Sequence, residues 1–213
     1  MSWFWNPTAH RYQWLNGSAR FLARATVLEW VETLLSGSAS ASDTLADLVA
    51  GSLLAPSDWF AAMRQEIKDV YIQEYLLGIG GRGRMIQADW GSVGGMIAEQ
   101  YRWLNGFYDE ILAGNLTEAQ IAARARMYIN SANEAYERAF GRLAVKAGMD
   151  EESWNLGPVK TEHCDDCSGY ENEGWQAIDY FPTPGDGSTL CLTNCQCHKS
   201  YQKASTGEEF WID

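Results

Sequence analysis

The five cysteines are the residues best suited to chemistry in this chain, and all lie in one stretch that begins HCDDCSG at His163 and ends CLTNCQCH at His198. Cysteines can pair as disulfides, catalyse redox reactions or bind a metal ion. An odd number of thiols cannot all pair, which argues against a closed set of disulfides. A thioredoxin-like site would need its C-x-x-C at a strand–helix junction in a βαβ unit, and the surrounding pattern predicts no such unit. The sequence therefore favours metal binding.

The spacing of these cysteines is typical of a structural zinc site. A C-x-x-C pair lets two thiolates in one tight turn reach a single ion, and a C-x-x-x-C-x-C group follows after 23 residues. Structural zinc takes four Cys or His ligands in a tetrahedron. The predicted ligands are Cys164, Cys167, Cys191 and Cys195. The neighbours that could replace one of them are Cys197, His198 and His163.

A catalytic zinc site would differ, because it keeps one position open for water and needs a general base nearby. The chain contains neither H-E-x-x-H nor H-x-E before P-C-x-x-C, the signatures of common zinc proteases and deaminases. Asp165 and Asp166 lie inside the C-x-x-C and are expected to face solvent, which leaves Glu162 as a formal candidate base. We therefore predict that the protein is not an enzyme, with a zinc-dependent hydrolase or nuclease as the alternative.

Negative charge is concentrated in the part of the chain that holds the cysteines. Residues 151–213 carry twelve acidic and three basic side chains, a net charge of −9, whereas residues 1–150 carry sixteen and thirteen, a net charge of −3. DNA binding draws its affinity largely from Lys and Arg side chains that displace counterions from phosphates. The cysteine region is thus a poor DNA-binding zinc ribbon, and we expect no sequence-specific nucleic-acid partner.

The composition is that of a globular protein, with 46% hydrophobic and 21% charged residues. No stretch approaches 18 uninterrupted apolar residues, so we expect no membrane span. The opening segment MSWFWNPTAHRYQW lacks a basic region followed by a continuous apolar core, so we do not expect a signal peptide. The expected environment is a reducing cytosol, where thiols stay free.

Apolar residues recur at helical spacing through residue 147, which predicts a mainly α-helical N-terminal part. The first apolar stripe, over residues 21–35, is expected to end at the flexible SGSASAS run of residues 36–42. The next predicted helices cover residues 45–49, 60–70 and about 89–113. The second of these is expected to stop at the glycine-rich segment GIGGRG.

The segment NLTEAQI carries the clearest helix start in the chain. Thr117 and Gln120 have the spacing of a capping box, and Leu116 and Ile121 occupy the positions of a hydrophobic staple. Apolar residues then continue without a breaker almost to Leu143. This pattern predicts one long helix of about eight turns.

After Gly148 the helical period ends, and short segments such as GWQAIDYF predict only brief strands. About 50 residues of this kind bury too little apolar surface to fold alone, so a bound metal is expected to hold them together. The predicted fold is therefore mainly α, with a helical domain over residues 1–150. Residues 151–205 form a small, loop-rich, zinc-stapled module with short β strands, and residues 206–213 form an acidic aromatic tail.

Aromatic residues crowd both ends of the chain. Those near the N-terminus are Trp3, Phe4, Trp5, Tyr12 and Trp14. In the tail GEEFWID they are Phe210 and Trp211. Large aromatic side chains at a terminus either pack back into the core or anchor a partner protein, and the sequence leaves both interpretations open.

An ordered series of motifs resembles a known family. The run LTEAQIAARARMYINSANEAYERA is followed by W-x-L-G, by H-C-x-D-C, by GW and by P-G-x-G-x-T-x-C-x-x-N-C-x-C. Together these resemble the C-terminal half of tailed-phage minor head proteins, the phage Mu F-like head morphogenesis family. The resemblance covers about residues 85–202.

The resemblance implies a largely helical protein with a cysteine-bearing module, associated with the portal vertex and involved in head assembly and DNA delivery. The implied partners are the portal and other phage head or neck proteins, with several copies of the chain in each particle. The implied location is the virion, and the host cytoplasm during assembly. Many relatives carry a His where this chain has Leu192, with Cys191 one residue earlier, so the identity of the fourth metal ligand stays open.

Overall fold

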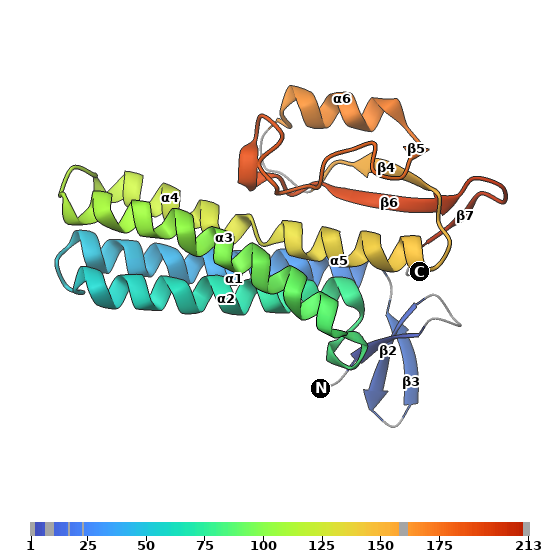
Figure 1. Ribbon diagram of the computed structural model, residues 1–213, viewed down its shortest axis with the longest axis horizontal. Coiled ribbons are helices and arrows are strands. Elements are labelled where there is room, and N and C mark those ends of the chain that lie inside the picture. Colours follow the sequence, from blue (N-terminus) through green and yellow to red (C-terminus); the bar gives the residue numbers. More distant parts are fainter. Residues whose placement is uncertain (1–2, 7–10, 17, 23, 158–161, 211–213) are drawn as a thin grey trace.

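The computed structural model of the chain describes residues 3–6, 11–16, 18–22, 24–157 and 162–210. It contains a bundle of long helices, a four-stranded sheet beside the bundle and a three-stranded sheet built from the first strands of the chain (Figure 1). The prediction of a mainly α fold with a small, strand-containing C-terminal module is confirmed. No helix within these ranges is both long and apolar enough to cross a membrane.

The helical bundle is organised around α2. Its members are α1 (Arg24–Ala50), α2 (Pro56–Ile79), α3 (Gln87–Leu112), α4 (Glu118–Asn130) and α5 (Asn133–Lys146). α2 contacts each of the other four helices. Its apolar residues recur every three or four positions, so that Trp59, Met63, Ile67 and Tyr71 share one face and are completely buried. As predicted, α2 ends at the glycine-rich segment.

The predicted end of the first helix at the SGSASAS run is wrong, because α1 continues through that run to Ala50. Serine and glycine have weaker helix propensity than alanine, but the packing on either side of the run decides the outcome. Leu35 before the run and Ala46 after it are buried in the bundle core. Ser42, also completely buried, donates its hydroxyl hydrogen bond to the carbonyl oxygen of Ala39 at 2.9 Å. The small side chains thus let α1 lie against α2 and α4.

The single long helix predicted after Thr117 is also wrong, because α4 and α5 are separated by a turn at Ser131 and Ala132. The predicted capping box at the start of α4 is present. The break lies at a buried polar side chain: the Ser131 hydroxyl accepts a hydrogen bond from the Tyr71 hydroxyl at 2.8 Å and donates one to the carbonyl oxygen of Tyr128 at 2.9 Å. A serine that bonds back to its own helix competes with the regular backbone pattern.

Three short strands precede the bundle, where helix was expected from residue 21. They are β1 (Trp3–Asn6), β2 (Arg11–Asn16) and β3 (Ser18–Leu22), paired antiparallel in the order β1-β2-β3. The aromatic residues of these segments have high strand propensity, and an Asn-Gly dipeptide follows at the end of β2. The helical part of the predicted N-terminal domain therefore begins at Arg24.

The C-terminal module is a thin sheet between two helices. Its strands are β4 (Glu151–Asn155), β5 (Gln176–Ala177), β6 (His198–Lys203) and β7 (Glu208–Glu209), antiparallel in the order β5-β4-β6-β7. β6 lies along α5 of the bundle, and the helix α6 (Asp165–Glu173) lies on the other side of the sheet (Figure 1). The brief strand predicted in GWQAIDYF is present as β5, whereas α6 was not predicted.

The aromatic tail packs back into the core at Phe210. This side chain has no exposed surface and lies 5.4 Å from the ring of Phe140 in α5, measured between ring centroids. Its backbone N–H donates to the carbonyl oxygen of Tyr201 at 2.6 Å. The interpretation of Phe210 as an exposed anchor for a partner is therefore wrong. Trp211 and the side chains of the N-terminal aromatics lie outside the described residues.

Candidate metal centre

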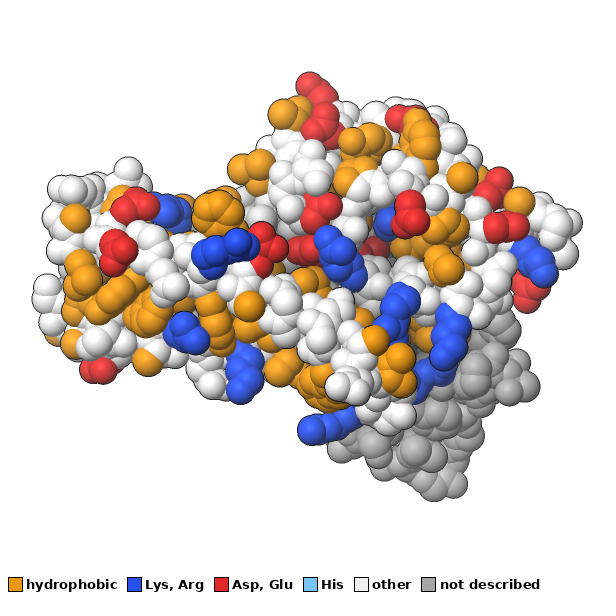
Figure 2. Space-filling view, viewed as in Figure 1, with side chains coloured by type: hydrophobic (Ala, Val, Ile, Leu, Met, Phe, Trp, Pro, Cys, Tyr) orange, Lys and Arg blue, Asp and Glu red, His pale blue; other side chains and the backbone are white. Residues whose placement is uncertain are grey.

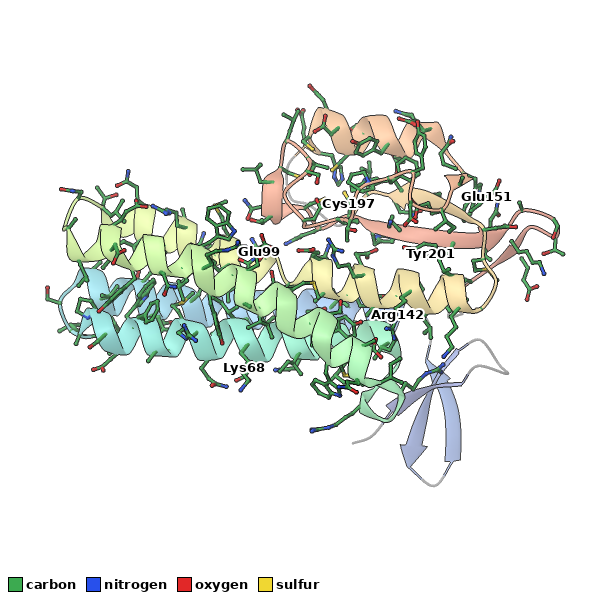
Figure 3. The ribbon with its side chains drawn as sticks, viewed as in Figure 1. Lys68, Glu99, Arg142, Glu151, Cys197 and Tyr201 are labelled. Atoms are coloured by element: carbon green, nitrogen blue, oxygen red, sulfur yellow. The ribbon has the colours of Figure 1, made fainter. Side chains whose placement is uncertain are left out.

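The cysteines reach one place from two segments of the module. Cys164 is the N-cap residue of α6, and Cys167 lies in its first turn, so the C-x-x-C spans a helix start. Cys191 and Cys195 flank a short 3-10 turn, and Cys197 directly precedes β6. Figure 3 places Cys197 between α6 and the bundle. The two segments predicted to share an ion therefore do meet.

The sulfur atoms form two overlapping groups of three. In each group all Sγ atoms lie within 4.8 Å of one another: Cys164, Cys167 and Cys191 in one, and Cys167, Cys195 and Cys197 in the other. Cys167 belongs to both groups, and its Sγ is 3.7 Å from that of Cys191 and 3.7 Å from that of Cys195. With zinc–sulfur bonds of about 2.3 Å, neighbouring corners of a tetrahedron lie about 3.8 Å apart. These two separations thus match the edge of a thiolate-bound zinc tetrahedron, although among the described residues no four sulfur atoms belong to one group.

All five cysteines, including the four predicted ligands, converge on Cys167, which groups with Cys164 and Cys191 and also with Cys195 and Cys197. Among the described residues no four sulfur atoms form one such group, and neither His163 nor His198 belongs to a group of potential ligands. Five thiols are thus available for four coordination positions, and the structure leaves open which four of them would share an ion. The cysteine clusters could hold a metal ion.

The cysteines share a small core with aromatic side chains. Cys167 and Cys195 are each 1% exposed and Cys197 is 3% exposed. They pack with the rings of Trp154 and Phe181, whose centroids lie 6.2 Å apart. This core is separate from that of the helical bundle. The sulfur cluster is therefore part of the packing of this module.

Hydrogen bonds within the cluster make some thiols more acidic than others. The thiol of Cys195 donates to the sulfur of Cys197, and this bond, with the N–H of Gly157, lowers the pKa of Cys197 to about 5. The same bond and burial raise the pKa of Cys195. Burial raises the pKa of Cys164, but the N–H and thiol of Cys167 oppose it, and the net effect lowers that pKa. Thiolates are thus favoured where a cation would stabilise them further.

Gly157 is a supporting residue that the search for ligands missed. Its backbone lies against the loop between Cys195 and Cys197, where a Cβ would be only 1.8 Å from the carbonyl oxygen of Gln196. Its N–H donates to the sulfur of Cys197. Hydrogen bonds from the surroundings orient metal ligands and tune their charge. The W-x-L-G motif, which ends at this glycine, was the available signal.

Asp166 has a structural role that contradicts the expectation of a solvent-facing carboxylate. Its side chain is half-buried and accepts a hydrogen bond from the backbone N–H of Leu190 at 2.8 Å. This bond ties the start of α6 to the residue before Cys191. Asp165 is exposed, as predicted.

The module is attached to the bundle next to the cysteines. The Asn133 side chain, in the first turn of α5, donates hydrogen bonds to the carbonyl oxygens of Cys195 and Cys197, both at 3.1 Å. The backbone N–H of Lys199 donates to the Glu137 carboxylate at 3.0 Å. These contacts are buried, so the cysteine loop is fixed to a helix of the bundle.

A buried ion pair links the paired strands β4 and β6 of the sheet. The ammonium group of Lys199 lies 3.0 Å from the carboxylate of Glu152, and their side chains are 7% and 1% exposed. The second carboxylate oxygen of Glu152 accepts a hydrogen bond from the N–H of Phe181 at 2.8 Å. Removing one partner of such a pair would leave a buried charge uncompensated.

Comparisons with models of protein families, with curated proteins and with solved structures give no match to this chain. The resemblance to phage minor head proteins therefore rests on its ordered motifs and stays a prediction.

Proposed function

We propose that the protein binds one structural zinc ion and acts as a minor head protein of a tailed phage, supporting head assembly and DNA delivery at the portal vertex. The observation that carries the zinc proposal is the convergence of five thiols in a buried aromatic core. Soft thiolate ligands in tetrahedral geometry are typical of zinc or of iron–sulfur sites. The two 3.7 Å sulfur separations are those expected between ligands of a four-coordinate zinc ion, which supports the proposal.

The positions of the resembling motifs support the assignment to head proteins. The W-x-L-G motif supplies Trp154, which packs on the cysteines, and Gly157, which contacts their loop. The helical run of the resemblance supplies Asn133, which holds the carbonyl oxygens beside two of the thiols. Residues from separate motifs thus meet at one structural site, which favours a shared architecture over a chance series of matches.

A zinc-dependent hydrolase or nuclease is the alternative function. Such an enzyme would leave one coordination position open to substrate and place a general base beside it. Here five thiols compete for four positions, and three of them are almost completely buried. Glu162, the formal candidate base, is exposed and belongs to neither group of potential ligands. These observations favour a closed structural site.

Metal analysis of the purified protein tests the zinc proposal. We expect about one equivalent of zinc, in line with a single four-coordinate site. Cys167→Ser should lose the metal, because Cys167 belongs to both sulfur groups. Ser168→Ala is the matched control in the same helix and should retain it. A metal-free wild-type protein with an unchanged C-terminal fold would refute the proposal.

Single serine substitutions at Cys164, Cys191, Cys195 and Cys197 identify the other ligands. The variants that lack a true ligand should bind zinc far more weakly, whereas the variant that lacks the spare thiol should retain it. Cobalt substitution adds an independent measurement, since the visible spectrum of the bound cobalt depends on the number of thiolates and on tetrahedral geometry. A spectrum typical of a water-bearing site would favour the enzyme instead.

Mass spectrometry of purified virions tests the biological role. We expect the protein in mature particles of the phage that encodes it, at a copy number consistent with a position at one vertex. Deletion of the gene should reduce infectious particles, and expression of the wild-type chain in trans should restore them. Absence of the protein from virions, with normal infectivity after deletion, would overturn the head-protein assignment while leaving the zinc site intact.

A further inference from the structure

A cationic and aromatic groove runs between α2 and α3, on the helical bundle. Its volume is about 760 Å³. The lining residues that define it here are Phe60, Arg64, Lys68, Trp90, Ile97 and Tyr101. No acidic residue in the described part of the chain lines the groove, although the full sequence carries a net charge of −12. The groove would therefore attract an anionic partner, whereas the negative charge of the rest of the chain would repel it.

The cations of the groove are not neutralised by carboxylates. Arg64 and Lys68 form no ion pair with any carboxylate in the described part of the chain, whereas six other basic side chains do. The guanidinium carbon of Arg64 instead lies 3.9 Å from the centroid of the Tyr101 ring. Lys68 is exposed (Figure 3). Both charges are thus available to a ligand.

The wall formed by α3 also leaves room for a helix. A Cβ atom built on Gly94 or on its neighbours Gly91 and Gly95 would meet nothing within 4 Å. Trp90, one turn earlier, is 38% exposed. The groove therefore combines an open floor, an exposed aromatic edge and two free cations, which are the features of a site that receives an amphipathic acidic helix.

The same chain carries an acidic surface, on and beside α6, that suits this groove. The apolar side chains of α6, Cys167 and Tyr170, pack on the cysteine core, so the face that α6 leaves free is acidic. α6 has the sequence DDCSGYENE, and its Glu171 and Glu173 are exposed. Beside it, Tyr180 is 55% exposed. At 1.5 Å per residue the nine residues of α6 span about 14 Å, and the stretch of α2 from Phe60 to Ile72 that lines the groove spans about 18 Å. The two surfaces match in length and are opposite in charge.

We propose that the chain associates head to tail, with α6 of one copy bound in the α2–α3 groove of the next. In Figure 1 α6 lies at one edge of the molecule and α2 at the opposite edge, so one copy cannot use both surfaces on the same neighbour. Figure 2 shows acidic side chains gathered over the C-terminal module and basic ones over the bundle. Contacts between two different patches extend into chains or close into rings. This inference does not depend on the phage assignment.

Sedimentation velocity on the purified zinc-bound protein tests it. Exposed ion pairs each contribute about 0.2–1 kcal/mol and are screened by salt. We therefore expect oligomers at about 20 mM salt that dissociate at about 300 mM. Lys68→Glu and Glu171→Lys should each weaken association about two- to fivefold. Lys203→Glu, a charge reversal at an exposed lysine outside both surfaces, should leave association unchanged.

Mixing the two charge-reversed proteins separates this arrangement from others. The Glu171→Lys protein keeps an intact groove, and the Lys68→Glu protein keeps an intact α6, so their mixture can form one intact contact. We expect a 1:1 heterodimer that does not extend further. Circular dichroism and zinc content of each variant verify that it is folded.

Three results would overturn the proposal. One is a wild-type protein that stays monomeric at low salt. Another is association that survives Lys68→Glu, which would place the interface elsewhere. The third is any result that assigns the groove a different occupant. Dissociation by a groove variant but not by Glu171→Lys would be such a result. Binding of a single-stranded oligonucleotide to the groove of a protein that does not self-associate would be another.

Discussion

Replacing Gly157 with alanine changes the metal centre without touching a ligand. The Cβ of the new residue would lie 1.8 Å from the carbonyl oxygen of Gln196 and 3.1 Å from the backbone nitrogen of Cys197. Real Cβ atoms do not approach heavy atoms closer than 3.0 Å, so the two backbones must separate by about 1.2 Å, the difference between 3.0 and 1.8 Å. Neither neighbour is a flexible side chain that can turn away.

This displacement is large compared with the tolerance of a metal site. Zinc–ligand distances vary by only about 0.2 Å between well-formed sites. The loop that must move carries Cys195 and Cys197, and it is fixed on its other side by the two hydrogen bonds from Asn133. Overpacking of this kind commonly costs about 1–3 kcal/mol in a core, which corresponds to about one to two orders of magnitude in zinc affinity if the strain falls on the bound state.

Competition with a chromogenic chelator measures that affinity. The Gly157→Ala protein should release zinc at a chelator concentration that leaves the wild-type protein loaded, while the circular dichroism signal of the bundle is retained. Gly169→Ala is the matched control, because a Cβ on that residue of α6 meets nothing within 4 Å. Its zinc affinity should equal that of the wild type.

Equal zinc affinity in the Gly157→Ala and wild-type proteins would refute the reasoning. It would mean that the loop between Cys195 and Cys197 moves freely by more than 1 Å, in conflict with the hydrogen bonds that Asn133 makes to it. It would also favour Cys164, Cys167 and Cys191 as the dominant ligands, because that group lies away from the displaced loop.

Two further predictions concern stability. Phe210→Ala should lower the free energy of unfolding by about 3–5 kcal/mol in chemical denaturation, because this completely buried ring packs on Phe140. Trp103→Ala, at a side chain that is 62% exposed, is the control and should change the free energy of unfolding little. A Phe210→Ala protein as stable as the wild type would contradict the burial of the Phe210 ring. Glu74→Met should stabilise the protein at pH 7 by about 1–4 kcal/mol, because the completely buried carboxyl has no hydrogen-bond partner among the described residues. Burial, and then repulsion from Glu137, raise the pKa of Glu74 well above its ordinary 4.5. The folded state therefore holds the proton more tightly than the unfolded state. As a consequence, the free energy of unfolding of the wild-type protein falls as pH rises above 4.5. The stabilisation by Glu74→Met, obtained from denaturation curves at several pH values, should therefore grow from pH 4.5 towards neutral pH, and a pH-independent difference would show that the carboxyl is not buried as described.

The position of the metal centre could be predicted from the sequence, but its supports could not. Thiols at C-x-x-C spacing have few uses in a loop-rich segment, so their residue types and spacing indicated the site. Which four of the five thiols would share an ion depends on how the two segments meet in space, and the spacing within each segment carries no information about that. Gly157 escaped the search for ligands because its role is a backbone contact, and Asp166 because its partner is a backbone N–H far along the chain.

Helix starts and ends were predictable where they are set by local chemistry. The capping box at Thr117 and the glycine after α2 act on neighbouring residues, and both were recognised. The continuity of α1 through a serine-rich run and the break at Ser131 are set by contacts with other helices. The Tyr71 hydroxyl that bonds Ser131 comes from a residue 60 positions earlier. Periodicity within one segment carries no information about such a partner.

The sheet that follows the domain boundary predicted at residue 150 contributes side chains to two cores. On one side of β6 Tyr201 joins the core of the helical bundle, and a Cβ on Gly141 of α5 would lie 2.5 Å from its hydroxyl oxygen. At the other end of the sheet, Trp154 of β4 packs with the thiols. Loss of the metal should therefore unfold the cysteine segments and α6, because the sulfur cluster and its aromatic neighbours form their core. The strand β6 should stay folded, because its contacts with α5 belong to the bundle. The metal centre and the bundle are thus coupled through β6, and a module cut out at residue 150 would lose one of the two surfaces that hold its sheet.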